Sequence, residues 1–265
     1  MEPRYVKIAL GVAATLVMAF LYLPLVVIVL DAFIPDRSTS WPVTTLSTRW
    51  FSTAYHDQAA RQALGKSLEV AAGANAVAVL LGSASAFAVH RFRFFGREAV
   101  SFLLVLPIAL PGVVTGIALL SAMNQFSVAG SVLTIVLGHA TFCIVVVYNN
   151  ALARLRRMGS SLEEASMDLG ADGWLTFRHV TLPTISTALV AGALLAFALS
   201  FDEIIVTYFT AGSTQTLPLW IYNQFSLPNQ QPEVNAVAVF VIGLTIIPVL
   251  LAQRLMRDTG GVAGR

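Results

Sequence analysis

The sequence contains few charged residues and a single cysteine. Only 11% of its 265 residues are Asp, Glu, Lys or Arg, and 57% are hydrophobic, whereas soluble proteins carry about 25% charged residues. A soluble domain could not cover its surface with so little charge, and the mean hydropathy is high at +0.76. Cys143, the one cysteine, cannot form an internal disulfide. Composition therefore favours a membrane protein over a soluble globular protein.

Recognisable catalytic patterns are also missing. The four histidines are scattered along the chain, without the paired spacing typical of metal ligands. No Ser-His-acid arrangement or pair of carboxylates stands out. We therefore expect that the chain is not an enzyme by itself and that it holds no metal.

Long uncharged runs predict an all-α, polytopic membrane protein. A helix of about 20 residues crosses the hydrocarbon core, and the runs lack the strict alternation of a membrane barrel. Residues 99–153 contain no charged residue and are long enough for two spans, with a polar and glycine-containing break at 124–130. Six transmembrane helices are therefore expected. They lie in residues 8–30, 70–89, 99–153 (two), 184–201 and 234–253.

The distribution of Lys and Arg predicts the orientation. With a cytoplasmic N-terminus, twelve of the sixteen Lys and Arg residues fall on the inner side and four on the outer side, as the positive-inside rule requires. The first run is longer than the apolar region of a signal peptide and lacks an obvious small-residue cleavage site, so it is expected to be retained. Both termini are therefore placed in the cytoplasm.

One inner loop, residues 154–183, is polar and has the pattern of two short helices. Ser160 with Glu163, or Ser161 with Glu164, forms the spacing of a capping box at a helix start. Acidic residues also interact favourably with the first turn of a helix.

The second half of this loop continues the pattern. Gly170 fits the left-handed residue that ends a helix, and Asp172 fits the cap of a second helix. Trp174, Phe177 and Val180 follow at a spacing of three, which places them on one helix face. The loop is either a hairpin whose caps only end its helices, or a rigid knob whose apolar residues dock into a partner.

The same loop resembles the EAA motif of ABC-importer permeases. That motif reads Glu-Ala-Ala, three residues, Gly, nine residues, Ile, one residue, Leu-Pro. Every spacing is kept here, with Ser166 in place of the second Ala and Val180 in place of Ile. The matching residues are Glu164-Ala165-Ser166, Gly170, Val180 and Leu182-Pro183.

In that family the segment is a coupling helix that sits in a groove of a cytoplasmic ATPase. The resemblance therefore implies a coupling segment at 160–183. The residues implied in ATPase coupling are Glu163, Glu164, Ala165, Leu169, Gly170, Ala171, Trp174, Phe177, Leu182 and Pro183.

Shorter stretches extend the resemblance to most of the chain. Residues 66–71, 82–91 and 107–116 resemble the permease core, although Lys66 stands where Asn is usual. A narrower likeness to spermidine and putrescine permeases lies in three stretches, residues 200–203, 209–212 and 216–220.

The family resemblance also implies partners and an organisation. It implies a bacterial inner-membrane importer with a second homologous permease, two copies of an ATPase and an extracytoplasmic solute-binding protein, and no nucleic acid. ATP and Mg would bind the ATPase, and this chain would bind no cofactor. The expected organisation is a first helix and outer loop (1–65), a permease core of five helices (66–255) and a cytoplasmic tail (256–265).

Two acidic residues at the outer end of the fifth predicted span are candidates for the substrate pathway. Charges at the end of a membrane span are costly to keep, which indicates a functional role for Asp202 and Glu203. Their carboxylates would attract the ammonium groups of a polyammonium substrate. The aromatic faces of Tyr208 and Trp220 could add cation–π attraction. The alternative is that the two carboxylates only mark the water boundary of the helix.

Glycine and proline shape the third predicted span. Gly112 and Gly116 are four residues apart, a spacing that lets two helices approach closely. The neighbouring helix belongs either to this chain or to a second permease. Pro107 and Pro111 are expected to bend the same span.

Other classes of protein stay open at this point. A secondary transporter or channel for a small organic amine is also polytopic, but no convincing repeat is present. A non-transporting membrane scaffold would have no use for the outer acidic pair. Among ABC permeases, an amino-acid-like amine, ferric iron or thiamine are alternative cargoes to a polyamine.

Overall fold

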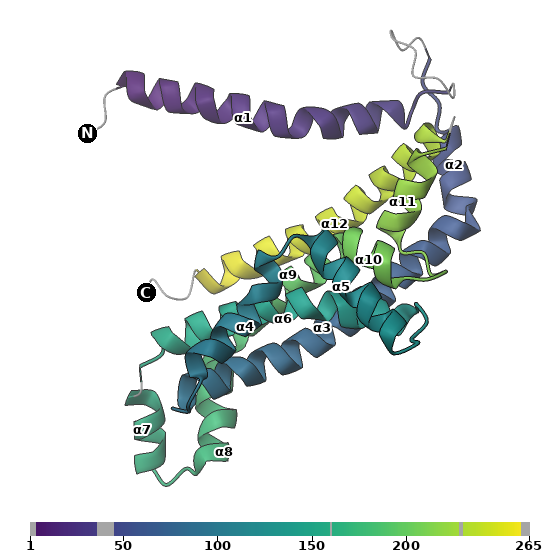
Figure 1. Cartoon of the computed structure of the whole chain (residues 1–265). Helices are drawn as coiled ribbons and strands as arrows, with labels where there is room; N and C mark the ends of the chain where they lie inside the picture. Colours follow the sequence, from purple (N-terminus) through teal and green to yellow (C-terminus); the bar gives the residue numbers. More distant parts are fainter. Residues whose placement is uncertain (1–3, 36–44, 160, 228–229, 261–265) are drawn as a thin grey trace. The chain divides into compact units, whose positions relative to one another are not determined.

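The described part of the chain is mostly helical and contains no strand, which confirms the predicted all-α class. The computed structural model describes residues 4–35, 45–159, 161–227 and 230–260, with side chains as far as Thr245. The elements in Figure 1 are α1 (Arg4–Asp31), α2 (Arg49–His56), α3 (Gln58–Arg91), α4 (Arg97–Ala109), α5 (Gly112–Gln125), α6 (Val132–Arg157), α7 (Ser161–Asp168), α8 (Gly173–Thr176), the π-helix η1 (Phe177–Thr181), α9 (Leu182–Asp202), α10 (Ile205–Thr210), α11 (Leu217–Phe225) and α12 (Gln231–Gly260).

The membrane-spanning helices match most of the predicted runs. Within the described residues, four helices are long and apolar enough to cross a membrane, and the α4–α5 pair makes a fifth span if it counts as one. The four are Arg4–Asp31, Gln58–Arg91, Val132–Arg157 and Gly173–Asp202. Helix α12 covers the sixth predicted run, and its described side chains end at Thr245. The count of six spans stays a prediction.

The third predicted span is broken instead of bent. Helices α4 and α5 meet at an angle of 106°. Leu110 is extended (ψ 141°), because a residue before proline is driven out of the helical region. Pro111 directly precedes the first residue of α5. Pro107 lies inside α4. Pro111 therefore ends one helix and permits a new direction for the next.

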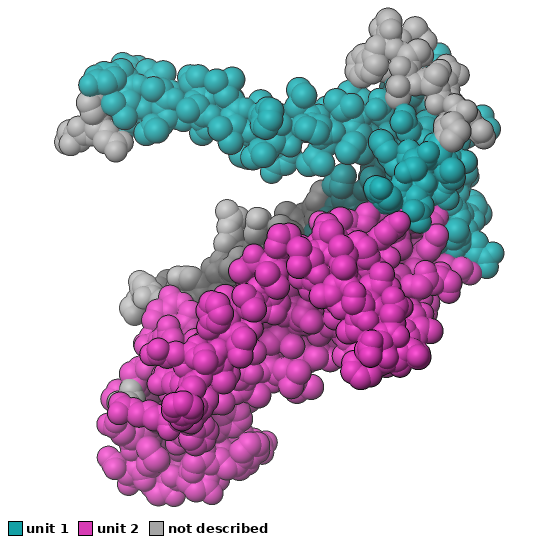
Figure 2. All heavy atoms as spheres, in the orientation of Figure 1, with its two compact units in different colours: residues 1–61, 221–265 teal, residues 62–220 magenta. Residues whose placement is uncertain are grey.

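The chain divides into two compact units (Figure 2). Unit 1 comprises residues 1–61 and 221–265. In it, Phe51 of α2 packs against Phe33 at 4.8 Å and edge-on against Phe240 of α12 at 5.6 Å between ring centroids. Trp50 Nε1 donates a hydrogen bond to the Ile34 carbonyl at 2.9 Å. Helix α1 buries none of its side chains, as suits a helix that faces lipid.

Unit 2, residues 62–220, is built around α6. Val89 of α3, Tyr148 and Leu155 of α6, and Ile185 of α9 form one buried apolar cluster. Tyr148 also donates a hydrogen bond to Ser101 of α4 at 3.0 Å. Helix α6 therefore joins α3, α4 and α9 into one core.

The two glycines of α5 lie against α10 within this chain. A Cβ atom at Gly116 would overlap Cδ2 of Phe209, whereas a Cβ atom at Gly112 would meet Ile205 at an ordinary 3.7 Å. Gly116 thus permits a close approach of α5 to α10 that no larger residue allows without movement of the Phe209 ring.

This contrast yields a matched pair of variants. Gly116→Ala should destabilise the protein by about 1–3 kcal/mol, because the added methyl overpacks the contact with Phe209. Gly112→Ala should change stability much less. Thermal unfolding of the purified protein in detergent measures both. Equal effects of the two changes would contradict the assigned contact.

Candidate functional site

The polar loop of the sequence folds into a short helical hairpin at one end of unit 2. It runs through α7, α8 and η1 and continues without interruption into α9. Figure 1 shows α7 and α8 projecting beyond the rest of this unit. Residues 161–181 are called the α7–η1 segment below.

The turn between α7 and α8 closes with a regular pattern of backbone hydrogen bonds. Gly170 has φ +87°, a value that residues with a Cβ adopt only with strain. Its N–H donates to the Met167 carbonyl at 2.9 Å, and the N–H of Ala171 donates to the Ser166 carbonyl at 3.1 Å. This pair of bonds is the Schellman motif. The predicted role of Gly170 in ending the helix is confirmed.

The start of α8 also follows the sequence prediction. Asp172 Oδ1 accepts a hydrogen bond from the Leu175 N–H at 2.8 Å, so the predicted cap is confirmed. Helix α7 begins at Ser161, and Ser160, the predicted cap of α7, lies outside the described residues. Ser166 and Thr176 hydroxyl groups lie 3.2 Å apart and join α7 to α8.

The prediction that Trp174, Phe177 and Val180 share one face of a regular α-helix is wrong in one respect. Residues from Phe177 to Thr181 form a π-helix, in which the Leu182 N–H donates to the Phe177 carbonyl. Pro183, the second residue of α9, explains this turn, because proline lacks an N–H and its ring crowds the carbonyl four residues before it. The rings of Trp174 and Phe177 still stack at 5.7 Å.

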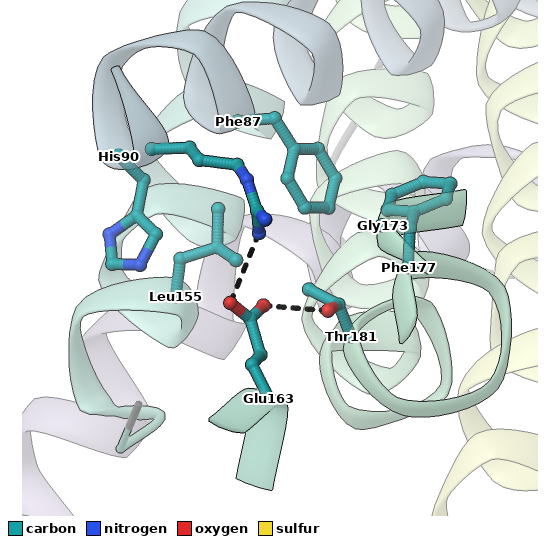
Figure 3. Close-up of a pocket in the computed structure, with 8 residues that line it drawn as sticks. Phe87, His90, Leu155, Glu163, Gly173, Phe177 and Thr181 are labelled. Atoms are coloured by element: carbon teal, nitrogen blue, oxygen red, sulfur yellow. Dashed lines mark hydrogen bonds and ion pairs between the residues drawn. The ribbon is translucent and has the colours of Figure 1, made fainter. Parts of the chain in front are cut away.

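Glu163 points from α7 into the unit, as Figure 3 shows. Its Oε2 lies 3.1 Å from a terminal nitrogen of Arg91, the last residue of α3. Its Oε1 accepts a hydrogen bond from the Thr181 hydroxyl at 2.7 Å. The sequence pattern did not single out Arg91 or Thr181 as partners, because Arg91 lies 72 positions from Glu163 in the chain.

A cavity of about 380 Å³ lies beside this carboxylate (Figure 3). The apolar part of its wall comes from Phe87, Leu155 and Phe177. Phe87 of α3 meets Phe177 edge-on at 5.0 Å between ring centroids. The packing between the α7–η1 segment and α3 is therefore partly open.

The outward side of the segment carries large apolar side chains among its charged residues. Leu169 is 90% exposed and Trp174 is 65% exposed. The other implied coupling residues are distributed as follows: Glu164, Ala165, Gly170, Leu182 and Pro183 are exposed, whereas Glu163, Ala171 and Phe177 are half-buried. Large apolar side chains held on a capped turn indicate a surface that a partner covers.

The acidic pair lies at the opposite end of α9. Asp202, the last residue of α9, is exposed. Glu203 Oε1 accepts a hydrogen bond from the Val206 N–H at 2.9 Å and so satisfies a free donor in the first turn of α10. One carboxylate therefore caps a helix, and the other faces outward.

The two aromatic candidates differ in the same way. Tyr208 is 62% exposed, whereas Trp220 is only 2% exposed. The structure therefore leaves Asp202 and Tyr208 accessible and buries the Trp220 ring.

A buried histidine that the sequence pattern did not single out connects α6, α9 and α10. His139 has no exposed surface, and its Nδ1 and Nε2 lie 2.8 Å from the hydroxyl groups of Ser200 and Thr207 respectively. Thr207 donates its own proton to the Glu203 carbonyl at 2.9 Å. The tautomer that satisfies all three residues has Nε2–H donating to Thr207 and Nδ1 accepting from Ser200.

Loss of this histidine should weaken the fold. His139→Leu leaves the buried Ser200 hydroxyl without its partner, which should reduce the free energy of unfolding by about 1–3 kcal/mol. His56→Leu is the control, because His56 is exposed. Thermal unfolding in detergent measures both variants, and a His139→Leu protein as stable as its control would contradict this role.

Comparison with known proteins identifies a family and several similar proteins. Residues 78–259 match the family described as binding-protein-dependent transport system inner membrane component. The putrescine transport system permease protein PotI of Escherichia coli (strain K12) is 36% identical over 246 residues, which cover 89% of this chain and 86% of PotI. The spermidine/putrescine transport system permease protein PotC of the same organism is 32% identical and covers 92% of each chain.

A solved structure shares the fold. A chain from a bacterial ABC transporter involved in the import of the acidic polysaccharide alginate superposes with a TM-score of 0.74. The match covers 96% of this chain and 98% of that chain, at 17% sequence identity. The likeness extends over nearly the whole of both chains.

Proposed function

The chain belongs to the family of binding-protein-dependent transport system inner membrane components, and on this premise we propose that it is a permease subunit of an ATP-driven polyamine importer. It provides part of the path through the membrane. A second permease completes the path, a separate ATPase pair binds ATP and Mg, and an extracytoplasmic binding protein delivers the substrate. The observation that carries the proposal is the exposed apolar surface of the α7–η1 segment, in a chain of this family.

The length of α9 supports the placement of the α7–η1 segment and Asp202 on opposite sides of the membrane. Its 21 residues run from Leu182 to Asp202, a length of about 30 Å at 1.5 Å per residue. This length matches the hydrocarbon thickness of a bilayer. The α7–η1 segment then faces the cytoplasm, where the ATPase is, and Asp202 faces the side from which the substrate arrives. Both termini are cytoplasmic in this arrangement.

The ATPase contact rests on shape and exposure. Leu169 and Trp174 are the most exposed of the large apolar residues in the segment, and the Gly170 turn and the Asp172 cap hold the backbone under them. A rigid presentation suits an element that must transmit movement, because a fraying helix would absorb it. The two side chains insert into a groove of the ATPase and anchor the contact.

Charge substitutions on the segment test this contact. Leu169→Asp and Trp174→Asp should each abolish or strongly reduce copurification of the ATPase, because each places a charge in an apolar interface and removes about 2 kcal/mol or more of binding energy. Leu46→Asp is a matched control, since Leu46 is 72% exposed and far from the segment in sequence. Retention of the ATPase by both segment variants would overturn the assigned docking surface.

A polyamine is the proposed cargo because the similar permeases PotI and PotC are named for putrescine and spermidine transport. The accessible carboxylate of Asp202 and the exposed ring of Tyr208 offer a negative charge and a π face. Both attract ammonium groups.

Neutralisation of Asp202 tests the cargo path. Asp202→Asn should lower putrescine uptake by the complete transporter in proteoliposomes by about tenfold, because it removes one counter-ion worth about 1.4 kcal/mol. Asp57→Asn is the control, since Asn at position 57 can still accept the hydrogen bond from the Ala59 N–H at the start of α3. Unchanged uptake by Asp202→Asn would remove Asp202 from the path.

A further inference from the structure

We propose that Glu163 latches the α7–η1 segment to α3, so that movement of the segment displaces α3 and α9 together. Glu163 is a positioning residue in this role, and the inference rests on the proposed function of the segment. Its carboxylate faces inward, toward Arg91 and Thr181 (Figure 3), and the contact with the ATPase is left to Leu169 and Trp174.

The attachment of the segment to its two neighbouring spans is unequal. Helix α9 continues directly from η1, so the covalent backbone transmits any displacement of the segment to α9. Helix α3 ends at Arg91 and is joined to α7 through the Arg91–Glu163 ion pair at 3.1 Å. Without this pair, a displacement of α7 would reach α3 only indirectly, through the buried cluster that α3 shares with α6 and α9.

Apolar packing does not replace the ion pair. Helix α7 buries none of its side chains, and the cavity of about 380 Å³ separates part of the segment from Phe87 and Leu155. The edge contact between Phe87 and Phe177 lies at η1, after the turn. Glu163 is thus the residue through which α7 itself holds the end of α3.

The second oxygen of Glu163 fixes where the latch acts. Thr181, the last residue of η1, donates a hydrogen bond to it at 2.7 Å and is buried. One carboxylate therefore contacts the end of α3 and the turn that leads into α9. Such a shared contact keeps the two spans in a fixed relation while the segment moves.

The exposure of the pair separates a coupling role from a stabilising one. The Arg91 side chain is 47% exposed and that of Glu163 is 19% exposed, and an ion pair whose cation is open to water contributes little to folding stability. Removal of the charge should therefore leave the protein folded and bound to the ATPase while the movement of α3 becomes uncoupled.

Conservative substitutions isolate the ion pair. Glu163→Gln keeps an oxygen that accepts from Thr181 but loses the charge that attracts Arg91. Arg91→Gln removes the other charge, and the double variant completes a cycle. Glu69→Gln is the matched control, because it breaks the 2.8 Å ion pair of Lys66 with Glu69, which lies within α3 and joins no second element.

The experiment uses the complete transporter in proteoliposomes and measures ATPase copurification, ATP hydrolysis and putrescine uptake. Glu163→Gln and Arg91→Gln should each retain the ATPase but lower putrescine uptake per ATP hydrolysed by about tenfold, a typical size for coupling between distant sites. The double variant should be no worse than either single variant. Glu69→Gln should match the wild type.

The outcomes distinguish the latch from the proposed function. A wild-type chain that fails to retain an ATPase overturns the proposed function. If the wild type couples uptake to ATP hydrolysis and Glu163→Gln has the same uptake per ATP, the latch alone is overturned. Additive losses in the double variant also overturn it. Loss of the ATPase from folded Glu163→Gln also overturns it, because Glu163 would then be a docking residue.

Discussion

The hydrocarbon of a membrane offers no water to an unpaired polar group, and unit 2 is organised by that constraint. Several of its helix ends and its buried histidine find hydrogen-bond partners within the chain. His139 lies between two hydroxyl groups, Glu203 caps the first turn of α10, and Gly170 lets the last carbonyls of α7 find donors. The apolar surfaces that remain exposed then have two explanations, contact with lipid or contact with a partner.

The α7–η1 segment belongs to the second case. Its exposed leucine and tryptophan flank a turn that is closed by backbone hydrogen bonds and an aspartate cap, ahead of Arg178 and of the uncharged run that begins at Leu182. The segment also continues into α9 through a π-helix just before Pro183. A partner that pushes on this turn therefore acts directly on a helix long enough to cross the membrane.

The inward face of the same segment explains how a push could reach more than one span. Glu163 contacts the last residue of α3 and the last residue of η1 with its two oxygens. The cavity beside it leaves room for the segment to shift against Phe87. A charged contact across an incompletely packed boundary can follow such a shift, because ion-pair geometry tolerates more displacement than close apolar packing.

The sequence alone determined the features that depend on local chemistry. Uncharged runs predicted the long helices, Gly170 and Asp172 predicted the turn and the cap, and the spacing from Glu164 to Pro183 predicted the family. Each depends on residues that are close together in the chain. The placement of Asp202 at a helix end followed from the same kind of pattern.

Only the tertiary structure decided which distant residues meet. Trp220 is an aromatic residue near an acidic pair in the sequence, yet it is buried. Gly116 faces Phe209, and Glu163 faces Arg91, across separations that no local pattern encodes. The break at Pro111 was expected as a bend, but its 106° angle depends on how α4 and α5 each pack. Local propensity fixes where helices begin and end, whereas contacts between them depend on the packing of all the side chains at once.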